Sequence, residues 1–147
     1  MHRLETELTP LPGVSEALAA LSGYSMAVVS NGAEAKVRTS LASSGLAEHF
    51  GDRIYSGYTA RCWKPDPSLF LYAADLMGHA PDDCVAIDDS IVGVKAALAA
   101  GMTVVHLNRY PDAEETPEGA IMISSMFQLP TVVASLTRSR NRAVSSH

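Results

Sequence analysis

The stretch from Cys84 to Gly101 constrains the fold of this 147-residue chain more than any other part of the sequence. Its first four residues form a short apolar run, which predicts a buried strand. Asp88 and Asp89 follow where that strand stops, and Ser90 is a good N-cap for an Ala-rich helix that ends at Gly101. Paired carboxylates at this position favour a site for a hard cation and a bridged anion. The alternative is that both acids only cap the helix, and this stretch alone leaves both interpretations open.

Length and composition favour one domain with a real core. Hydrophobic residues make up 47% of the chain, and the net charge of -5 gives no general reason to expect nucleic acid or an anionic membrane as a partner. No apolar run is long enough to cross a bilayer. The two cysteines, Cys62 and Cys84, do not suggest a disulfide framework. Because Cys84 falls in a predicted buried strand, we expect a reduced, cytoplasmic setting.

Hydrophobic spacing along the chain predicts strands that alternate with helices. The expected helices lie at residues 14–21, 33–44, 67–77, 91–100 and 127–136, and the expected strands at residues 24–29, 54–57, 84–87, 103–107 and 121–123. This alternation predicts the α/β class, with a Rossmann-like three-layer αβα arrangement around a mostly parallel sheet. We expect residues 1–13 to be a linker, residues 14–136 the core domain and residues 137–147 a frayed tail.

Three polar features fall where predicted strands or loops lead into helices. The turn Ser30-Asn31-Gly32 follows one strand, and its hydroxyl and backbone N–H groups suit a phosphate at a helix N-terminus. Lys64 lies in a Pro-flanked loop, and its ammonium group is a suitable point charge for a phosphoryl oxygen. Asp88 and Asp89 would then hold Mg²⁺, which commonly keeps waters and a substrate phosphate as its other ligands. Each feature also has a plain alternative: a capped turn, a solvated lysine and helix-capping acids.

Four other residues are weaker candidates. His106 lies near a strand end, but a lone histidine is more often structural. Trp63 could stack on a ligand, although packing is the simpler interpretation, and Asp66 is best explained as a helix cap. Cys62 has no obvious histidine partner, so we do not expect a thiol nucleophile.

In combination, these segments resemble the haloacid dehalogenase (HAD) superfamily of phosphohydrolases. Residues 28–32 are similar to the second motif of the family, residues 64–67 to the third, and residues 85–90, continuing to residue 102, to the fourth. Residues 55–58 and 61–67 look most like the branch of 6-phosphogluconate phosphatase and phosphoglycolate phosphatase. The resemblance covers roughly residues 8 to 136, with boundaries good to a few residues.

The resemblance implies a Mg²⁺-dependent phosphomonoester hydrolase that acts on a small sugar phosphate, such as 6-phosphogluconate, through an aspartyl-phosphate. Ser30, helped by the turn that follows it, would bind the transferring phosphoryl group. Lys64 would neutralise the phosphate and the nucleophilic carboxylate. Asp89 would be the principal Mg²⁺ ligand, with Asp88 a ligand or an acid behind it.

The family's first motif, Asp-x-Asp, has no counterpart after an apolar run in this chain, and neither has the cap domain that commonly follows it. The resemblance therefore implies that the chain is the C-terminal portion of a phosphatase, with residues 1–13 as the exit from a missing cap. We expect this portion to have little or no phosphatase activity on its own. In the family, the first strand lies between the strands that end here at Ser30 and Asp88. We expect those two strands to close up, or a second chain to fill the place, which would allow self-association through the incomplete sheet.

Three alternatives come from other classes. The first is a non-catalytic module that binds phosphate or a partner. The second is a haloacid dehalogenase, which shares the Ser-Asn-Gly and Lys-Pro features but needs no metal, so the acid pair counts against it. The third, a phosphoacceptor receiver domain, is discounted because Ser30 and Lys64 both precede Asp88. The substrate and the oligomeric state stay open.

Overall fold

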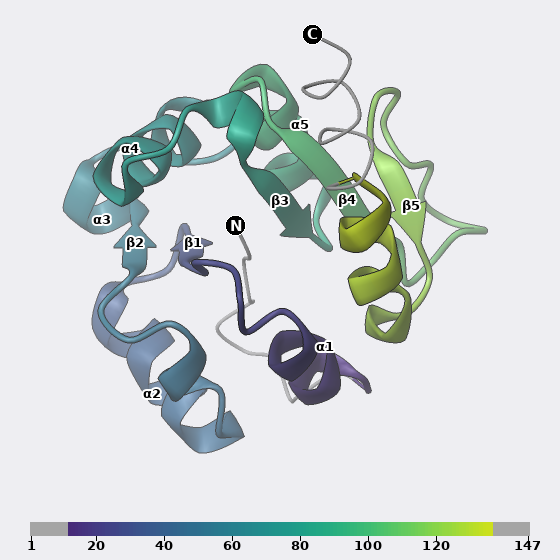
Figure 1. Cartoon of the computed structure of the whole chain (residues 1–147). Helices are drawn as coiled ribbons and strands as arrows, with labels where there is room; N and C mark the ends of the chain where they lie inside the picture. The colour runs from purple at the N-terminus through teal and green to yellow at the C-terminus, as the bar shows by residue number, and fades with distance from the viewer. Residues whose placement is uncertain (1–11, 137–147) are drawn as a thin grey trace, which may run out of the picture.

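The computed structural model of the chain describes residues 12–136, so the predicted tail and nearly all of the predicted linker lie outside the described residues. Helices and strands alternate along the chain, as the spacing predicts (Figure 1). The helices are α1 (Val14–Ala20), α2 (Glu34–Ser44), α3 (Gly57–Ala60), α4 (Ser68–Met77) and α5 (Ile91–Ala99), with short 3-10 turns η1 (Ala47–His49), η2 (Pro81–Asp83) and η3 (Met126–Gln128), and with residues 129–136 helical after η3. The strands are β1 (Val28–Ser30), β2 (Ile54–Ser56), β3 (Val85–Asp88), β4 (Thr103–Leu107) and β5 (Ile121–Ile123).

Every strand pairing in the described residues is parallel, and the strands form two sheets. One sheet has the order β1-β2, with Val28 opposite Ile54. The other has the order β3-β4-β5, with Asp88 opposite His106. The predicted α/β class with parallel strands is confirmed.

The expectation that the strands ending at Ser30 and Asp88 close up is wrong, because β1 and β3 belong to different sheets in the described part of the chain. Both β1 and β3 begin later in the sequence than predicted. Residues 24–27 are not strand, because the ladder with β2 starts only where the N–H of Val28 donates to the carbonyl of Arg53. Similarly, the N–H of Cys84 donates to the carbonyl of Pro81 at the end of η2, so β3 starts one residue later than predicted.

Two hydrophobic layers cover the strands and pass across both sheets. The first layer joins α1, α2 and the segment after β5 to strand residues that include Val28, Ile87 and Val105. The second layer joins α4 and α5 to the alternate residues Val29, Ala86 and Val104. Side chains of successive strand residues point to opposite faces, so this alternation places helices on both faces of the strands. The three-layer αβα arrangement is therefore present although the hydrogen-bonded ladder is divided.

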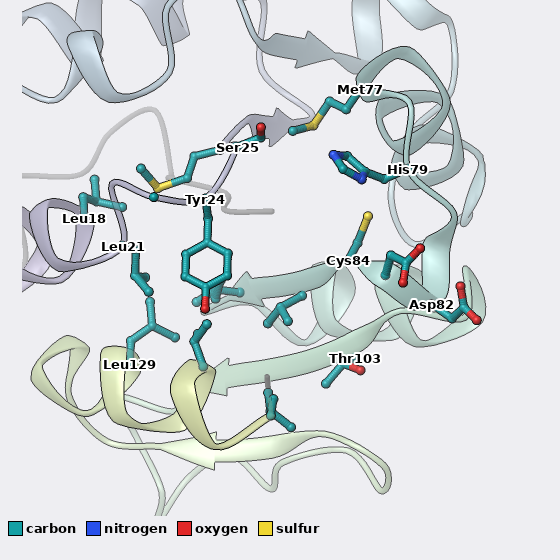
Figure 2. A pocket seen from close by; sticks show the side chains of 17 residues that line it. Leu18, Leu21, Tyr24, Ser25, Met77, His79, Asp82, Cys84, Thr103 and Leu129 are labelled. Carbon is teal, nitrogen blue, oxygen red and sulfur yellow. The ribbon is translucent and has the colours of Figure 1, made fainter. Parts of the chain in front are cut away.

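A cavity of about 460 Å³ opens in the first layer. It lies at the amino ends of the strands, because residues 24–26 lead into β1 and Cys84 and Thr103 adjoin the starts of β3 and β4. Figure 2 shows the side chain of Tyr24 in this cavity, with Leu129 below it and Met77 and His79 on the far side. The apolar lining comprises Leu18, Leu21, Met26, Met77, Val85, Ile87, Leu129, Val133 and Leu136. The cavity is thus at the opposite end of the strands from the predicted polar site.

The helix boundaries follow the predicted signals closely. Ser90 caps α5 by accepting a hydrogen bond from the N–H of Gly93, and Gly101 adopts a left-handed φ of 84° just after that helix. The predicted start of α4 is one residue early, because α4 begins at Ser68 and its N-cap is Pro67, which has no side-chain cap, rather than Asp66. The side chain of Asp66 accepts from the N–H of Ser68 just before the helix. The one-turn helix α3 is not predicted from the sequence. None of the helices in residues 12–136 has the length and hydropathy of a membrane span.

Candidate functional site

The turn after β1 is built by two buried serines. Ser30 ends β1, and its Oγ accepts a hydrogen bond from the N–H of Gly32 at 3.0 Å. Ser56, opposite Ser30 at the end of β2, donates from its Oγ to the carbonyl of Gly32 at 2.7 Å. The next helix, α2, has no side-chain cap at Ala33, so its first N–H groups have no capping side chain. This turn is therefore shaped to present a hydroxyl and backbone N–H groups to an anion.

Lys64 is held at this edge by the backbone and by Asn31. The Oδ1 of Asn31 accepts from the N–H of Lys64 at 2.9 Å, and its Nδ2 donates to the carbonyl of Lys64 at 3.4 Å. The lysine is only 5% exposed. Its Nζ donates to the carbonyl of Val29 at 2.9 Å and to Oδ2 of Asp88 at 3.0 Å, and lies 4.9 Å from the centre of the Phe70 ring. A solvated surface lysine is therefore excluded.

Asp88 is fully engaged inside the protein. Its Oδ1 accepts from both the N–H and the Oγ of Ser90, at 2.8 Å and 2.9 Å, while Oδ2 faces Lys64. Gly93 in α5 makes room for this carboxylate, because a Cβ at that position would lie 1.8 Å from Oδ2. The buried pair of Asp88 and Lys64 thus links β3 to the loop before α4.

Asp89 differs from its neighbour. Its side chain is 14% exposed, and its Oδ2 lies 3.5 Å from the guanidinium group of Arg109, which is itself 35% exposed. That distance is at the limit of a hydrogen bond. Of the two adjacent acids, Asp89 is therefore the one with a carboxylate at the surface of this edge.

The acid pair partly fits a Mg²⁺ ion. The described residues contain no group of three or more His, Cys, Asp or Glu side chains arranged to hold a metal. Since both oxygens of Asp88 have internal partners, Asp89 is the better placed carboxylate ligand. Mg²⁺ is commonly bound by one or two carboxylates together with waters and phosphate oxygens, which this donor set allows.

Two ionisable groups beside the lysine loop are perturbed. The hydrogen bonds from Ser68 lower the pKa of the Asp66 carboxyl. Burial raises the pKa of the Cys62 thiol, and the nearby Asp66 carboxylate adds to that effect. A thiol with a raised pKa is a poorer nucleophile at neutral pH.

The structure brings Ser30, Asn31, Gly32, Lys64 and Asp88 into one hydrogen-bonded group, with Asp89 next to it. Sequence reasoning missed the part played by Ser56, for which its place at the end of a predicted strand was the available signal. His106 lies beside Asp88 on β4 and is fully buried. Its Nδ1 contacts Thr116 at 2.8 Å, while its Nε2 has no hydrogen-bond partner in the described structure.

Comparison with known proteins relates this arrangement to one family. Residues 1–101 match the family of haloacid dehalogenase-like hydrolases. The chain is 35% identical over 102 residues to 6-phosphogluconate phosphatase of Escherichia coli K12, an alignment that covers 69% of this chain and 46% of that protein. It is 33% identical over 132 residues to hexitol phosphatase A of the same organism, which covers 85% of this chain and 58% of that protein. The chain thus spans about half the length of these curated relatives.

Solved structures agree with the sequence comparison. A HAD family hydrolase from Deinococcus radiodurans R1, with bound phosphate and sodium, superposes with a TM-score of 0.75 and 30% identity. The superposition covers 88% of this chain and 61% of that one. The predicted resemblance, including the branch of 6-phosphogluconate phosphatase, is confirmed.

Proposed function

The chain belongs to the haloacid dehalogenase-like hydrolase family, and from this membership we propose that its polar edge binds the phosphoryl group of a small phosphorylated sugar or sugar acid for Mg²⁺-dependent hydrolysis. One observation carries the proposal: the ammonium group of Lys64 is buried at the carboxyl end of β3, against Asp88. A buried cation beside a turn of N–H and hydroxyl donors suits a phosphate dianion. The names of the two relatives, a phosphogluconate and a hexitol phosphatase, support a sugar phosphate as the substrate class.

Each residue of the site has a definite role in this proposal. Ser30 Oγ accepts from Gly32, which leaves its own proton to donate to a phosphoryl oxygen. Lys64 neutralises charge on the phosphoryl group, and Asn31 fixes the lysine loop. Asp88 holds the ammonium group in place, and Asp89 binds Mg²⁺. When bound, the metal ion supplies positive charge for the phosphate oxygens.

Hydrolysis by this family's route needs a carboxylate that attacks phosphorus, and the family's first motif supplies it. The group formed by Ser30, Lys64, Asp88 and Asp89 contains no such free carboxylate, since Asp88 is ion-paired and Asp89 is assigned to the metal. We therefore expect this chain by itself to bind phosphate and to turn over sugar phosphates little or not at all.

The test is calorimetric titration of the chain with inorganic phosphate and with 6-phosphogluconate in the presence of MgCl₂. We expect saturable binding that Ser30→Ala weakens at least fivefold and Lys64→Met abolishes, while Lys36→Met on the exposed face of α2 leaves it unchanged. Circular dichroism of each variant separates lost binding from lost folding. Binding that survives both Ser30→Ala and Lys64→Met in folded protein would overturn the proposal.

A phosphate-release assay on the same samples checks the expected lack of turnover. Robust turnover of 6-phosphogluconate that disappears in Asp89→Asn would show that a nucleophile lies within this chain. Metal-independent release of chloride from 2-chloropropionate would instead favour the dehalogenase alternative.

A further inference from the structure

Two exposed aromatic side chains lie beside the turn of residues 30–32, which would hold the phosphate in the proposed function. They belong to neither of the two hydrophobic layers. Tyr58 in α3 is 64% exposed and Trp63, next to the lysine, is 45% exposed. Their rings meet edge to face, with centroids 6.0 Å apart and an interplanar angle of 85°. Both rings lie partly in solvent and keep a defined mutual geometry, so they present an ordered apolar surface at this edge of the sheet.

Hydrogen bonds tie both aromatic residues to the turn that follows β1. The Oγ of Ser56 accepts from the N–H of Tyr58 at 3.2 Å and donates to the carbonyl of Gly32. On the other side, Asn31 bonds to both the N–H and the carbonyl of Lys64, the residue next to Trp63. The two aromatic residues are thus fixed relative to the groups that would hold a phosphate.

The backbone around the pair is shaped to hold the Trp63 ring. Gly57 packs against it so closely that a Cβ at residue 57 would lie 2.6 Å from Cδ1 of the indole. Arg61, between the two aromatic residues in sequence, takes a left-handed φ of 57°, which is uncommon for a residue with a side chain. This conformation ends α3, because Arg61 is the C-cap of that helix. Arg61 is also exposed, so its positive charge faces solvent near the pair.

We propose that Tyr58 and Trp63 form a binding shelf for the carbon chain of a phosphorylated sugar acid whose phosphoryl group is held by Ser30 and Lys64, a subsite that rests on the proposed function. Aromatic faces pack against the C–H groups of a sugar chain, and sites for small ligands combine such surfaces with a few polar groups that fix orientation. The Tyr58 hydroxyl offers a hydrogen bond to sugar hydroxyls. Arg61 provides a cation for the carboxylate at the far end of the ligand.

The chain carries its own reporter for this subsite, because Trp63 is its single tryptophan. Tryptophan fluorescence of the full chain in MgCl₂ is titrated with 6-phosphogluconate, inorganic phosphate, gluconate and AMP, and calorimetry gives the affinities. We expect 6-phosphogluconate to change the fluorescence and to bind at least tenfold more tightly than inorganic phosphate. Gluconate, which lacks the phosphoryl group, should bind at least tenfold more weakly than 6-phosphogluconate.

Substitutions test whether Tyr58 and Trp63 provide the higher affinity for 6-phosphogluconate than for inorganic phosphate. Trp63→Leu and Tyr58→Ala should each lower the affinity for 6-phosphogluconate towards that for inorganic phosphate, and should leave the affinity for inorganic phosphate within twofold. Arg61→Gln should weaken the binding of 6-phosphogluconate more than the binding of glucose 6-phosphate, a sugar phosphate without a carboxylate. Tyr24→Ala is the control, because this tyrosine is also exposed but lines the cavity at the opposite end of the strands.

The outcomes separate the subsite from the proposed function. Equal affinities for 6-phosphogluconate and inorganic phosphate would overturn the subsite and leave phosphate binding intact, as would a preference that survives both Trp63→Leu and Tyr58→Ala. Tighter binding of AMP than of 6-phosphogluconate would assign the shelf to a base and overturn the proposed ligand. Absence of binding by either phosphate ligand would overturn the proposed function and the subsite together.

Discussion

The two sheets of this protein differ in how they are held. The sheet of β1 and β2 has two strands of three residues each, whereas the sheet of β3, β4 and β5 has three strands and the longest ladder, from Val85 to Asp88. An isolated two-stranded sheet is at best marginally stable in water. The smaller sheet must therefore depend on side chains that reach across to the larger one.

Three connections make that crossing. Both hydrophobic layers contain strand residues from the two sheets, such as Val28 with Ile87 in one layer and Val29 with Ala86 in the other. The third connection is Lys64, which bonds to the carbonyl of Val29 in β1 and to Asp88 in β3. The backbone N–H of Val28 bonds to Arg53 on the β2 side, so the backbone carbonyl of the next residue, Val29, points away from β2. Lys64 therefore satisfies a strand carbonyl that β2 cannot reach. A site residue thus also joins the two halves of the fold.

Removal of the ion pair between Lys64 and Asp88 should have the largest effect on the link between the two sheets. Lys64→Met leaves Asp88 buried without its counter-ion, which should cost about 3–5 kcal/mol of unfolding free energy. The double variant Lys64→Met/Asp88→Asn removes the orphaned charge and should recover part of that loss. Urea denaturation followed by circular dichroism measures both, with the exposed Lys36→Met as the control. A loss below about 1 kcal/mol for Lys64→Met would mean that the pair does not connect the sheets.

A matched pair of substitutions tests whether the two layers are packed differently. Val85→Ile adds a methylene beside the cavity of the first layer, and Val104→Ile adds one to the second layer, on the neighbouring strand. Overpacking should make Val104→Ile cost about 1–3 kcal/mol, whereas Val85→Ile should be neutral or stabilise by up to about 1 kcal/mol. Thermal melts at equal protein concentration compare them. Equal losses would show that the cavity is no looser than the rest of the core.

A smaller difference in stability is expected from the side chains at the start of one helix on each sheet. Ser90→Ala removes the side-chain cap of α5 on the larger sheet together with the hydroxyl hydrogen bond to Asp88, and should cost about 1–2 kcal/mol at pH 6. At the start of α4, which packs on β1 and β2, the Asp66 carboxylate accepts from the N–H of Ser68, one residue before the N-cap Pro67. Its pKa is lowered in the folded state, so its contribution is present above the unfolded pKa and is lost as the pH falls through the folded value.

The measurement for both helix starts is urea denaturation at pH 6 and pH 3. Asp66→Asn keeps an acceptor oxygen without the titrating group, so the difference between wild type and this variant should shrink at the lower pH. A difference that is the same at both values would show that the carboxylate charge contributes nothing at the start of α4.

The smallest expected effect is chemical and leaves the fold intact. Burial raises the pKa of the Cys84 thiol, with the Asp83 and Asp82 carboxylates adding to the shift, and burial also raises that of Cys62. Cys84 is buried just before β3, whereas Cys62 is partly exposed in the lysine loop. At pH 7.5 a maleimide reagent should therefore label Cys62 first, and both more slowly than free cysteine. Mass spectrometry of the Cys62→Ser and Cys84→Ser variants identifies the site, and faster labelling of Cys84 would show that the larger sheet opens first.

Much of the candidate site could be predicted from the sequence. The pattern of an apolar run, two acids, a capping serine and a later glycine places Asp88 at a strand end and starts α5 after Ser90, and both features are present. These signals are local, because a strand end and an N-cap depend on residues a few positions apart. Conversely, the hydrogen-bond partners of Asn31 and Ser56 could not be predicted, since they lie 33 and 24 residues away in sequence.

Local sequence patterns were enough to predict the family, the α/β class, the element order and the residues at the carboxyl edge of the strands. Periodicity, caps and short motifs carry that information within windows of about 18 residues or fewer. Tertiary structure decided that β1 and β3 stay in separate sheets, that Lys64 rather than a strand takes the carbonyl of Val29, and that Asp88 is enclosed while Asp89 reaches the surface. Those outcomes depend on contacts between segments far apart in the chain, where burial and hydrogen bonding are settled only once the layers have packed.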